Sequence, residues 1–264
     1  MDEKGAAQRE AGMDIYVIRH GQTNANLRHE LQGRRDVPLN EQGREQARRV
    51  RALLDDRGIL FDRVYSSPLG RAVETTRIVA GGNVPVVTDD RLLEMDYGPY
   101  EGMDLRKPAP EVVTFFSDFV HNPAPAGMEQ LSSVTARAGR FVEDVARSSG
   151  ERILVSTHAI LMKGILEYLT PGSRGSYWSK FIGNCALYQC FGLMERLACR
   201  WRLLTPSAGE VRHASIRGRR GFSASVRPST PVPARRRAEI GRSVVSPAKN
   251  LSGNCPSLRG AAAT

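Results

Sequence analysis

Short apolar runs, rich in β-branched and aromatic residues, recur along the first two hundred residues or so of the chain. Each run is bounded by glycine, proline or small polar residues, which is the pattern of buried strands rather than of half-exposed ones. The segments that this pattern predicts as strands are residues 13–18, 61–66, 84–87, 152–156, 185–191 and 199–204.

Between these runs, apolar residues recur every three or four positions, which predicts amphipathic helices. In one helix Ala47, Val50, Leu53 and Leu54 recur at helical spacing, and Asn40 is placed to cap the N-terminus. Strands that alternate with long helices predict an α/β domain with a mostly parallel sheet flanked by helices. The predicted helices are residues 39–56, 69–80, 111–120, 131–147 and 159–169, and residues 91–102 have no clear period and are expected to form a loop.

The periodic pattern stops after Pro206, where serine, proline, arginine, glycine and alanine dominate. Residues 207–264 hold 11 basic and two acidic residues, a charge of +9, so the rest of the chain carries only +1 of the total +10. Such a segment buries too little apolar surface to offset its ordering entropy. We therefore predict an N-terminal extension over 1–12, one domain over 13–206 and a disordered basic tail over 207–264. A tail that binds nucleic acid is the weaker alternative.

The cysteines, Cys185, Cys190, Cys199 and Cys255, form no CxxC pair and have no histidine cluster at metal spacing. We expect reduced thiols, no bound metal and a cytoplasmic location. The charged N-terminus does not resemble a secretory signal. No run approaches the roughly 20 apolar residues that a membrane helix needs, so no membrane contact is expected.

Two histidines follow predicted strands directly, His20 after the first and His158 after a later one. In open α/β sheets the carboxyl ends of the strands form the ligand-binding edge, so both are expected there. Arg19 and Arg71 would join them, and guanidinium groups match phosphate oxygens well. An imidazole among cations stays neutral and nucleophilic. With Glu94 to protonate a leaving alkoxide, the set fits phosphoryl transfer through a phosphohistidine.

Two other acidic residues, Asp96 and Glu101, lie in the same predicted loop as Glu94. From the residues alone, each of the three could supply the acid. The choice among them depends on which carboxylate faces the histidines.

Five segments in order resemble the histidine phosphatase superfamily, with its phosphoglycerate mutase-like fold: RHGQTNAN, LQGRRDVPLNEQGREQA, SSPLGRAVETT, LLEMDYGPYEG and VSTHA. The resemblance covers residues 13–205. It implies that His20 is the phosphorylated nucleophile and that Arg19, Arg71 and His158 surround the phosphoryl group. It selects Glu94 as general acid and later base, and it implies no cofactor.

The resemblance also implies substrate contacts, with Asn26 on the phosphate. The other residues that it implies for substrate binding are Gly21, Gln22, Thr23, Gln32, Gly33 and Ala159. Three positions depart from the family pattern. Ala159 replaces the usual glycine after the second histidine, and Met128 and Gln130 replace the Gly and Ser of a GGES-like stretch.

The expected function is a metal-independent phosphomonoesterase that acts on a small phosphorylated metabolite. The segment between Glu94 and His158 lacks a long arginine-bearing insertion that mutases of this family use, and Arg106-Lys107 is its only adjacent basic pair. A phosphoglycerate mutase-type transferase is the first alternative. A non-catalytic phospho-ligand scaffold is the second, and a homodimer remains open.

Overall fold

The computed structural model describes residues 13–82, 84–191 and 200–204. The predicted N-terminal extension over 1–12, the predicted tail over 207–264, Cys199 and Cys255 all lie outside these residues. Their predictions are therefore not tested here.

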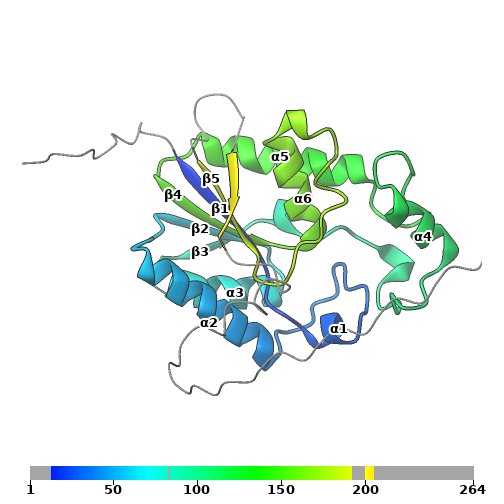
Figure 1. Ribbon diagram of the computed structural model, residues 1–264, viewed down its shortest axis with the longest axis horizontal. Coiled ribbons are helices and arrows are strands. Elements are labelled where there is room, and N and C mark those ends of the chain that lie inside the picture. The colour runs from blue at the N-terminus through cyan, green and yellow to red at the C-terminus, as the bar shows by residue number, and fades with distance from the viewer. Residues whose placement is uncertain (1–12, 83, 192–199, 205–264) are drawn as a thin grey trace, which may run out of the picture. The chain divides into compact units, whose positions relative to one another are not determined.

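A mixed sheet forms the centre of the described fold, with strands in the order β3-β2-β4-β1-β5-β6 (Figure 1). The first four in this order pair in parallel, and β5 pairs antiparallel with both of its neighbours. The predicted α/β architecture with a mostly parallel sheet is confirmed. The strands are β1 (Asp14–Arg19), β2 (Arg63–Ser66), β3 (Val86–Thr88), β4 (Arg152–Thr157), β5 (Leu187–Phe191) and β6 (Arg200–Leu203).

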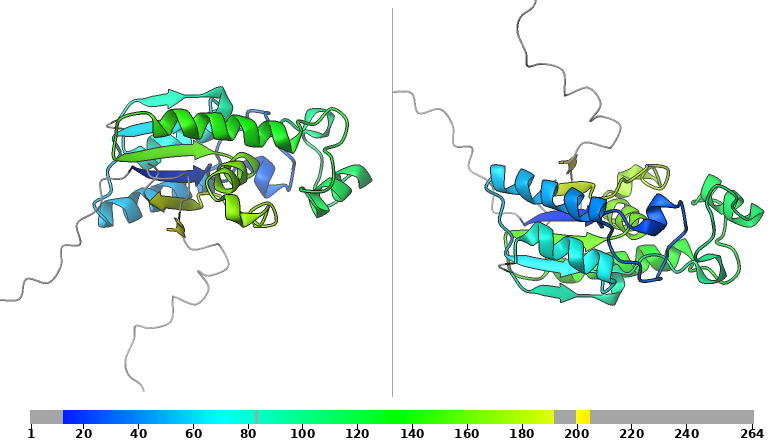
Figure 2. Two further views of the ribbon diagram at one scale, coloured as in Figure 1. Left: turned by 90° about the horizontal axis from the view of Figure 1, so that it is seen from above. Right: turned by 90° about the horizontal axis from the view of Figure 1, so that it is seen from below.

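Helices cover both faces of this sheet, as Figures 1 and 2 show. One face carries α2 (Glu41–Asp56) and α3 (Gly70–Ala80), and the other carries α5 (Leu131–Ala146) and α6 (Ala159–Tyr168). The short helices lie past the end of the sheet toward which β1 runs (Figure 2); they are α1 (Asn24–Leu27) and α4 (Pro110–Ser117). None of the described helices has both the length and the apolar composition needed to cross a bilayer.

Alternate residues of the central strand β1 supply two separate cores. Ile15 and Val17 belong to the apolar cluster that contains residues of α5 and α6. Tyr16 and Ile18 belong to a second cluster with residues of α2 and α3. A strand that is buried on both faces reads as a continuous apolar run, which explains the strong sequence signal of this segment.

Three predicted strands begin two residues later than their sequences suggested, and the second strand of the chain begins at Arg63 instead of at residue 61. The third starts at Val86, just after Pro85, whose missing N–H group cannot join a ladder. The fifth starts at Leu187 because Cys185 has a φ of 55°, in the left-handed region that a strand cannot use.

The expectation of reduced thiols is wrong for Cys190, which is buried on β5 and disulfide-bonded. Cys185 is also buried, and burial raises the pKa of its thiol to about 12. Such a thiol forms little thiolate at neutral pH, so Cys185 is not a nucleophile in this fold.

The turn after β1 rests directly against the first turn of α2. Asn40 caps this helix as predicted, because its Oδ1 accepts a hydrogen bond of 2.8 Å from the backbone N–H of Gly43. A Cβ atom at Gly43 would overlap the carbonyl oxygen of Gln22, and one at Gly21 would overlap Gly43. Glycine is therefore required at both positions, because the backbone of residues 21 and 22, directly after His20, meets the backbone of α2 at Gly43.

We predict that Gly43→Ala lowers the free energy of unfolding by about 1–3 kcal/mol, because two backbones must separate to admit the methyl group. Denaturant unfolding measures this change. Gly164→Ala in α6 is the control, since its Cβ would meet neighbours only at 3.5 Å or more. That substitution should be neutral or slightly stabilising, and equal losses in the two variants would contradict the packing argument.

Candidate active site

The parallel pairing of β1 with β4 brings the two strand-end histidines together. Arg19 lies opposite Thr157 in the register. The ladder continues by one bond, in which the backbone N–H of His20 donates to the Thr157 carbonyl at 2.9 Å. The strands therefore end at the same level, and the rings of His20 and His158 lie with centroids 5.1 Å apart. The predicted meeting of these two side chains is confirmed.

The His20 ring is buried and held in one orientation. Its Nδ1 donates a 2.7 Å hydrogen bond to the carbonyl oxygen of Gly21, which can only accept, so Nε2 carries the free lone pair. Burial lowers the pKa of His20 well below its usual value, and the charges of Arg71 and Arg19 lower it further. The bond to Gly21 opposes this shift without reversing it. The fold thus keeps a neutral imidazole at this position.

His158 is fully buried beside it, and Ser67 is its partner. The Oγ atom of Ser67 lies 2.8 Å from His158 Nε2. Burial again lowers the pKa most, followed by Arg71, His20 and Arg19. Ser67 belongs to the SSPLGRA motif, but the sequence analysis assigned it no role.

Two arginines line the same pocket as His20, Arg71 fully buried and Arg19 half-buried. Arg71 in the first turn of α3 donates to the carbonyl oxygens of Arg35 at 2.6 Å and Gly33 at 2.7 Å. Burial lowers the pKa of Arg71 to about 10, so it remains a cation at neutral pH. Arg19 donates through Nη1 to the carbonyl oxygen of Ile182. Burial also lowers the pKa of Arg19, against the attraction of Glu94.

Buried polar nitrogens without a hydrogen-bond partner gather at this site. Within the described residues, the buried side-chain nitrogens and oxygens that lack a partner are Arg19 Nε, Arg71 Nε and His158 Nδ1. An unsatisfied buried polar group destabilises a fold by about 1–3 kcal/mol. Two of these nitrogens belong to the cations Arg19 and Arg71, which line one pocket, so they offer open N–H donors to a ligand rich in negatively charged oxygen atoms.

The carboxylate of Glu94 sits at the N-terminus of α6. It accepts backbone N–H bonds from Ile160 and Leu161, each at 3.2 Å, and from Met95 at 2.9 Å. The positive end of a helix dipole favours a carboxylate in this position. These bonds hold the carboxylate in place, and Glu94 lines the same pocket as His20.

The other two candidate acids point elsewhere. Asp96 forms an ion pair of 3.3 Å with Arg34. Glu101 accepts the backbone N–H groups of Arg34 at 2.6 Å and Arg35 at 3.0 Å, so it organises that loop. Of the three carboxylates, Glu94 lines the pocket described next.

A pocket of about 290 Å³ opens over these groups. The predicted site residues that line it are Arg19, His20, Asn26, Gln32, Gly33, Arg71, Glu94 and Ala159. His158, also predicted for this site, is not among the lining residues, and its ring lies beside that of His20 with centroids 5.1 Å apart. Apolar side chains such as Leu31, Phe116 and Phe119 form much of its outer wall. These apolar residues were not predicted for the site, because the sequence motifs cover only the residues expected to bind the phosphoryl group.

The three residues after His20 are not among the residues that line the pocket. The backbone N–H of Gly21 donates to Thr75 Oγ1 at 3.0 Å, and that of Gln22 donates to Gln46 Oε1 at 3.0 Å. Thr23 caps α1. Their contact with substrate stays a prediction, and the structure gives them a role in fixing the turn.

Arg137 and Glu129 form a support that the sequence analysis missed. Arg137 on α5 donates to the carbonyl oxygens of Arg91 at 2.8 Å and Glu94 at 3.1 Å, and its Nε donates to Glu129 Oε1 at 2.9 Å. Both side chains are nearly buried. Glu129 lies between Met128 and Gln130, the two positions that depart from the GGES-like pattern of the family. Its contact with the loop of Glu94, more than thirty residues away, could not be predicted from sequence spacing.

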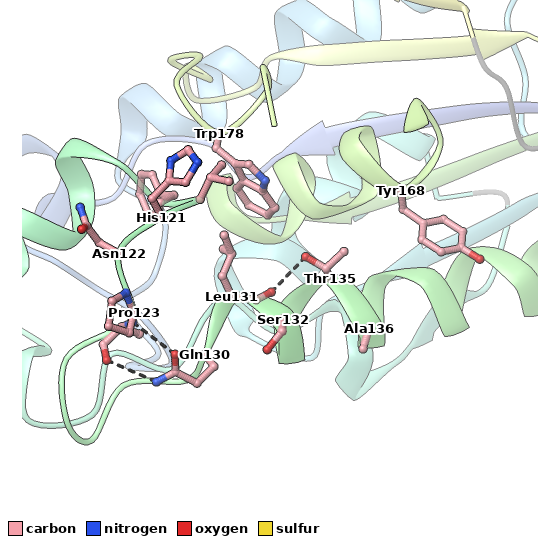
Figure 3. Close-up of a pocket in the computed structure, with 13 residues that line it drawn as sticks. His121, Asn122, Pro123, Gln130, Leu131, Ser132, Thr135, Ala136, Tyr168 and Trp178 are labelled. Atoms are coloured by element: carbon pink, nitrogen blue, oxygen red, sulfur yellow. Dashed lines mark hydrogen bonds between the residues drawn. The ribbon is translucent and has the colours of Figure 1, made fainter. Parts of the chain in front are cut away.

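A larger hollow of about 690 Å³ lies beside α5 and is shown in Figure 3. Its lining is mostly apolar and includes Leu131, Trp178 and Phe119, of which Phe119 also borders the smaller pocket. His121 at its edge is exposed and lies 2.7 Å from Asp118. The hollow contains neither the arginines nor the paired histidines, so the chemistry is assigned to the smaller pocket.

The depressed pKa values of His20 and His158 predict acid sensitivity. Below about pH 6.5 the unfolded chain takes up protons that the folded chain does not, so stability falls as pH falls. Between pH 7.5 and 5.5 we expect a loss of about 1.4 kcal/mol for each histidine. Urea unfolding in a buffer free of phosphate and sulfate measures this loss.

His20→Gln should remove about one histidine's share of that pH dependence. His29→Asn, at an exposed position with a φ of 60° that asparagine tolerates, is the control and should leave it unchanged. A pH-independent stability for the unsubstituted protein would contradict the buried neutral pair.

The profile of the histidine phosphatase superfamily (branch 1) matches residues 15–204. A phosphoglycerate mutase-like protein 4 from Arabidopsis thaliana is 35% identical over 168 residues, which cover 61% of this chain and 73% of that protein. A phosphoserine phosphatase 1 from Hydrogenobacter thermophilus is 29% identical over 187 residues, 69% of this chain and 87% of that protein.

Solved structures match the same part of the chain. The alpha-ribazole phosphatase from Shigella flexneri superposes with a TM-score of 0.63 at 26% identity, over 72% of this chain and 95% of that one. The matched range contains every residue of the pocket described above. The chain therefore belongs to the histidine phosphatase superfamily (branch 1) and is an enzyme of its phosphatase class, with the phosphoglycerate mutase-like fold.

Proposed function

We propose that this enzyme hydrolyses a small phosphomonoester without a metal ion, through a phosphohistidine at His20. The observation that carries the proposal is the set of unpartnered nitrogens on Arg19, Arg71 and His158 next to a neutral imidazole. Those nitrogens can donate to phosphoryl oxygens, and the arginine charges can stabilise the transition state. Asn26 Oδ1 accepts bonds from Thr23 and Asn184, and among the described residues no group accepts a bond from its amide nitrogen, which can donate to the same phosphate.

In the first step, Nε2 of His20 attacks phosphorus opposite the ester oxygen. The N–P bond forms as the P–O ester bond breaks. The carboxylic acid form of Glu94 gives its proton to the leaving oxygen, so the product alcohol departs neutral. Meanwhile the Nδ1–H bond to the Gly21 carbonyl holds the ring in the attacking tautomer.

In the second step, the Glu94 carboxylate accepts a proton from water as that water attacks phosphorus. The new P–O bond forms, the N–P bond breaks, and its electron pair returns to His20. Inorganic phosphate leaves and Glu94 is again protonated. The position of Glu94 at the N-terminus of α6 serves both steps because one carboxylate faces both the leaving and the entering oxygen.

Phosphate release to water is favoured over mutase-type transfer by the lining of the pocket. Between Glu94 and His158, the lining residues are Tyr97, Leu105, Phe116 and Phe119, with no arginine or lysine among them. Arg106 is exposed and paired with Asp104 at 2.8 Å. A mutase must grip its substrate while the phosphoryl group returns, and this segment offers no cation for that. The intact catalytic set argues against a non-catalytic scaffold.

The relatives named for phosphoserine and alpha-ribazole phosphate support a small metabolite as the substrate class. A cytoplasmic location, a homodimer and nucleic-acid binding by residues 207–264 remain predictions. Metal independence is part of the proposal. Among the described residues, no three His, Cys, Asp or Glu side chains cluster as metal ligands would.

We expect the full-length enzyme to hydrolyse p-nitrophenyl phosphate in the presence of a chelator. His20→Ala should lower kcat at least about 1,000-fold, because no nucleophile remains. Folding of the variant is checked by circular dichroism, and His29→Asn is the matched control with unchanged activity. Equal phosphate release from wild type and His20→Ala would refute the phosphohistidine route.

Arg137 should matter for turnover through the position of Glu94. Arg137→Lys keeps the charge, but three N–H donors cannot replace the five hydrogen bonds that the guanidinium donates to Glu129 and to the carbonyl oxygens of Arg91, Leu93 and Glu94. We therefore expect kcat to fall by about tenfold or more with little change in KM. Arg140→Lys on the exposed face of α5 is the control. An unchanged kcat in a folded Arg137→Lys variant would show that Glu94 does not need this support.

A further inference from the structure

Lys163 is a buried cation in an otherwise apolar stretch of α6. Its neighbours in the helix, including Leu161, Met162, Ile165 and Leu166, are core residues, whereas Lys163 is only 9% exposed. An ammonium group in such a place is unfavourable unless something compensates its charge. The residue lines the catalytic pocket, and the steps described above do not use it.

The contacts of Lys163 leave part of its hydrogen-bonding capacity open. Nζ donates to the carbonyl oxygen of Trp178 at 2.7 Å and lies 5.3 Å from the ring centroid of Phe119. An ammonium carries three N–H donors. Within the described part of the chain, no carboxylate lies within ion-pair distance of Nζ, although Glu94 attracts it and Arg19 repels it from farther away.

The lysine nevertheless remains mainly charged. Burial lowers the pKa of Lys163 to about 8, with the attraction of Glu94 opposing the shift. At pH 7 about nine in ten molecules therefore carry the ammonium. The pocket thus holds a positive charge, with open N–H donors, beyond the groups that bind the phosphoryl unit.

We propose that Lys163 binds a carboxylate on the leaving group of the substrate. This inference rests on the proposed function and specifies its substrate class as small phosphorylated carboxylic acids. Lys163 follows His158 by five residues, about 7.5 Å along the helix axis, and helical side chains lean back toward the N-terminus. The ammonium therefore serves a group only a few bonds from the ester oxygen.

The size and charge of the pocket favour a carboxylate over a second phosphate. A volume of about 290 Å³ must hold the phosphoryl group and the leaving group together, which leaves room for a small acid. Arg19 and Arg71 already face the phosphoryl group. A single ammonium, with one N–H engaged by the Trp178 carbonyl among the described residues, matches the charge of a monoanion better than that of a dianion.

The test compares 3-phosphoglycerate with glycerol 3-phosphate, which share a three-carbon skeleton and differ by a carboxylate against a hydroxymethyl group. Wild type should favour the acid by about tenfold or more in kcat/KM, the range expected for a hydrogen bond to a charged group. Lys163→Met should lose at least about ten times more kcat/KM on the acid than on the alcohol. Equal losses, or no preference in wild type, would overturn the proposal.

Two further variants distinguish specific binding by Lys163 from a nonspecific effect of positive charge in the pocket. Lys163→Arg keeps a cation and should retain most of the preference for the acid. Lys180→Met removes an exposed lysine at the rim of the same pocket, whose ammonium lies over Tyr177, and should leave the preference unchanged. If Lys163→Met does not fold, Lys163→Gln replaces it. A loss of preference in Lys180→Met as large as in Lys163→Met would also overturn the specific site.

Binding distinguishes this inference from the proposed hydrolysis. Calorimetric titration of His20→Ala with the same two compounds needs no turnover. We expect His20→Ala to bind 3-phosphoglycerate more tightly than glycerol 3-phosphate, and His20→Ala/Lys163→Met to lose this difference. That result supports the carboxylate site even if the wild type hydrolyses neither compound. In that case only the proposal of hydrolysis fails. Equal affinities for the two compounds would overturn the carboxylate site whether or not the enzyme turns over.

Discussion

The central feature of this structure is enclosed positive charge that forms no ion pair within the described residues, although Glu94 attracts it from farther away. Arg71 is buried and Arg19 is half-buried in the pocket that His20 lines, and within the described residues the Nε atom of each arginine is buried without a hydrogen-bond partner. The same burial and charge that keep the imidazoles neutral also make the site bind an anion. One electrostatic arrangement therefore yields both the nucleophile and the binding site for the group that it attacks.

The rest of the fold holds this arrangement in place. Parallel pairing sets the two histidines side by side, and glycines let the turn after β1 rest on α2. Arg137 and Glu129 brace the loop that carries Glu94, while the N-terminus of α6 fixes its carboxylate. A mobile imidazole or carboxylate would lose the alignment that in-line phosphoryl transfer requires, since small misplacements slow such reactions greatly.

Much of this could be predicted from the sequence because the signals were local. The doubly buried β1 reads as an apolar run, and a histidine that directly follows a strand must lie at the carboxyl edge of the sheet. Contacts between distant segments could not be predicted. The positions of Arg137 and Lys163 in the sequence do not reveal which carbonyl oxygens they contact. From the residues alone, the general acid could not be chosen among Glu94, Asp96 and Glu101, because that choice needs the orientation of each side chain. The left-handed residue at Cys185 and the disulfide at Cys190 also left no pattern.

The most direct test of the account is to identify the phosphorylated side chain during turnover. The enzyme would be mixed with an activated phosphomonoester, quenched in alkaline denaturant, where phosphohistidine survives, and digested for mass spectrometry. The account predicts phosphate on Nε2 of His20, present in wild type and absent from His20→Ala. Phosphate on another residue, or turnover without any phosphorylated intermediate, would contradict it.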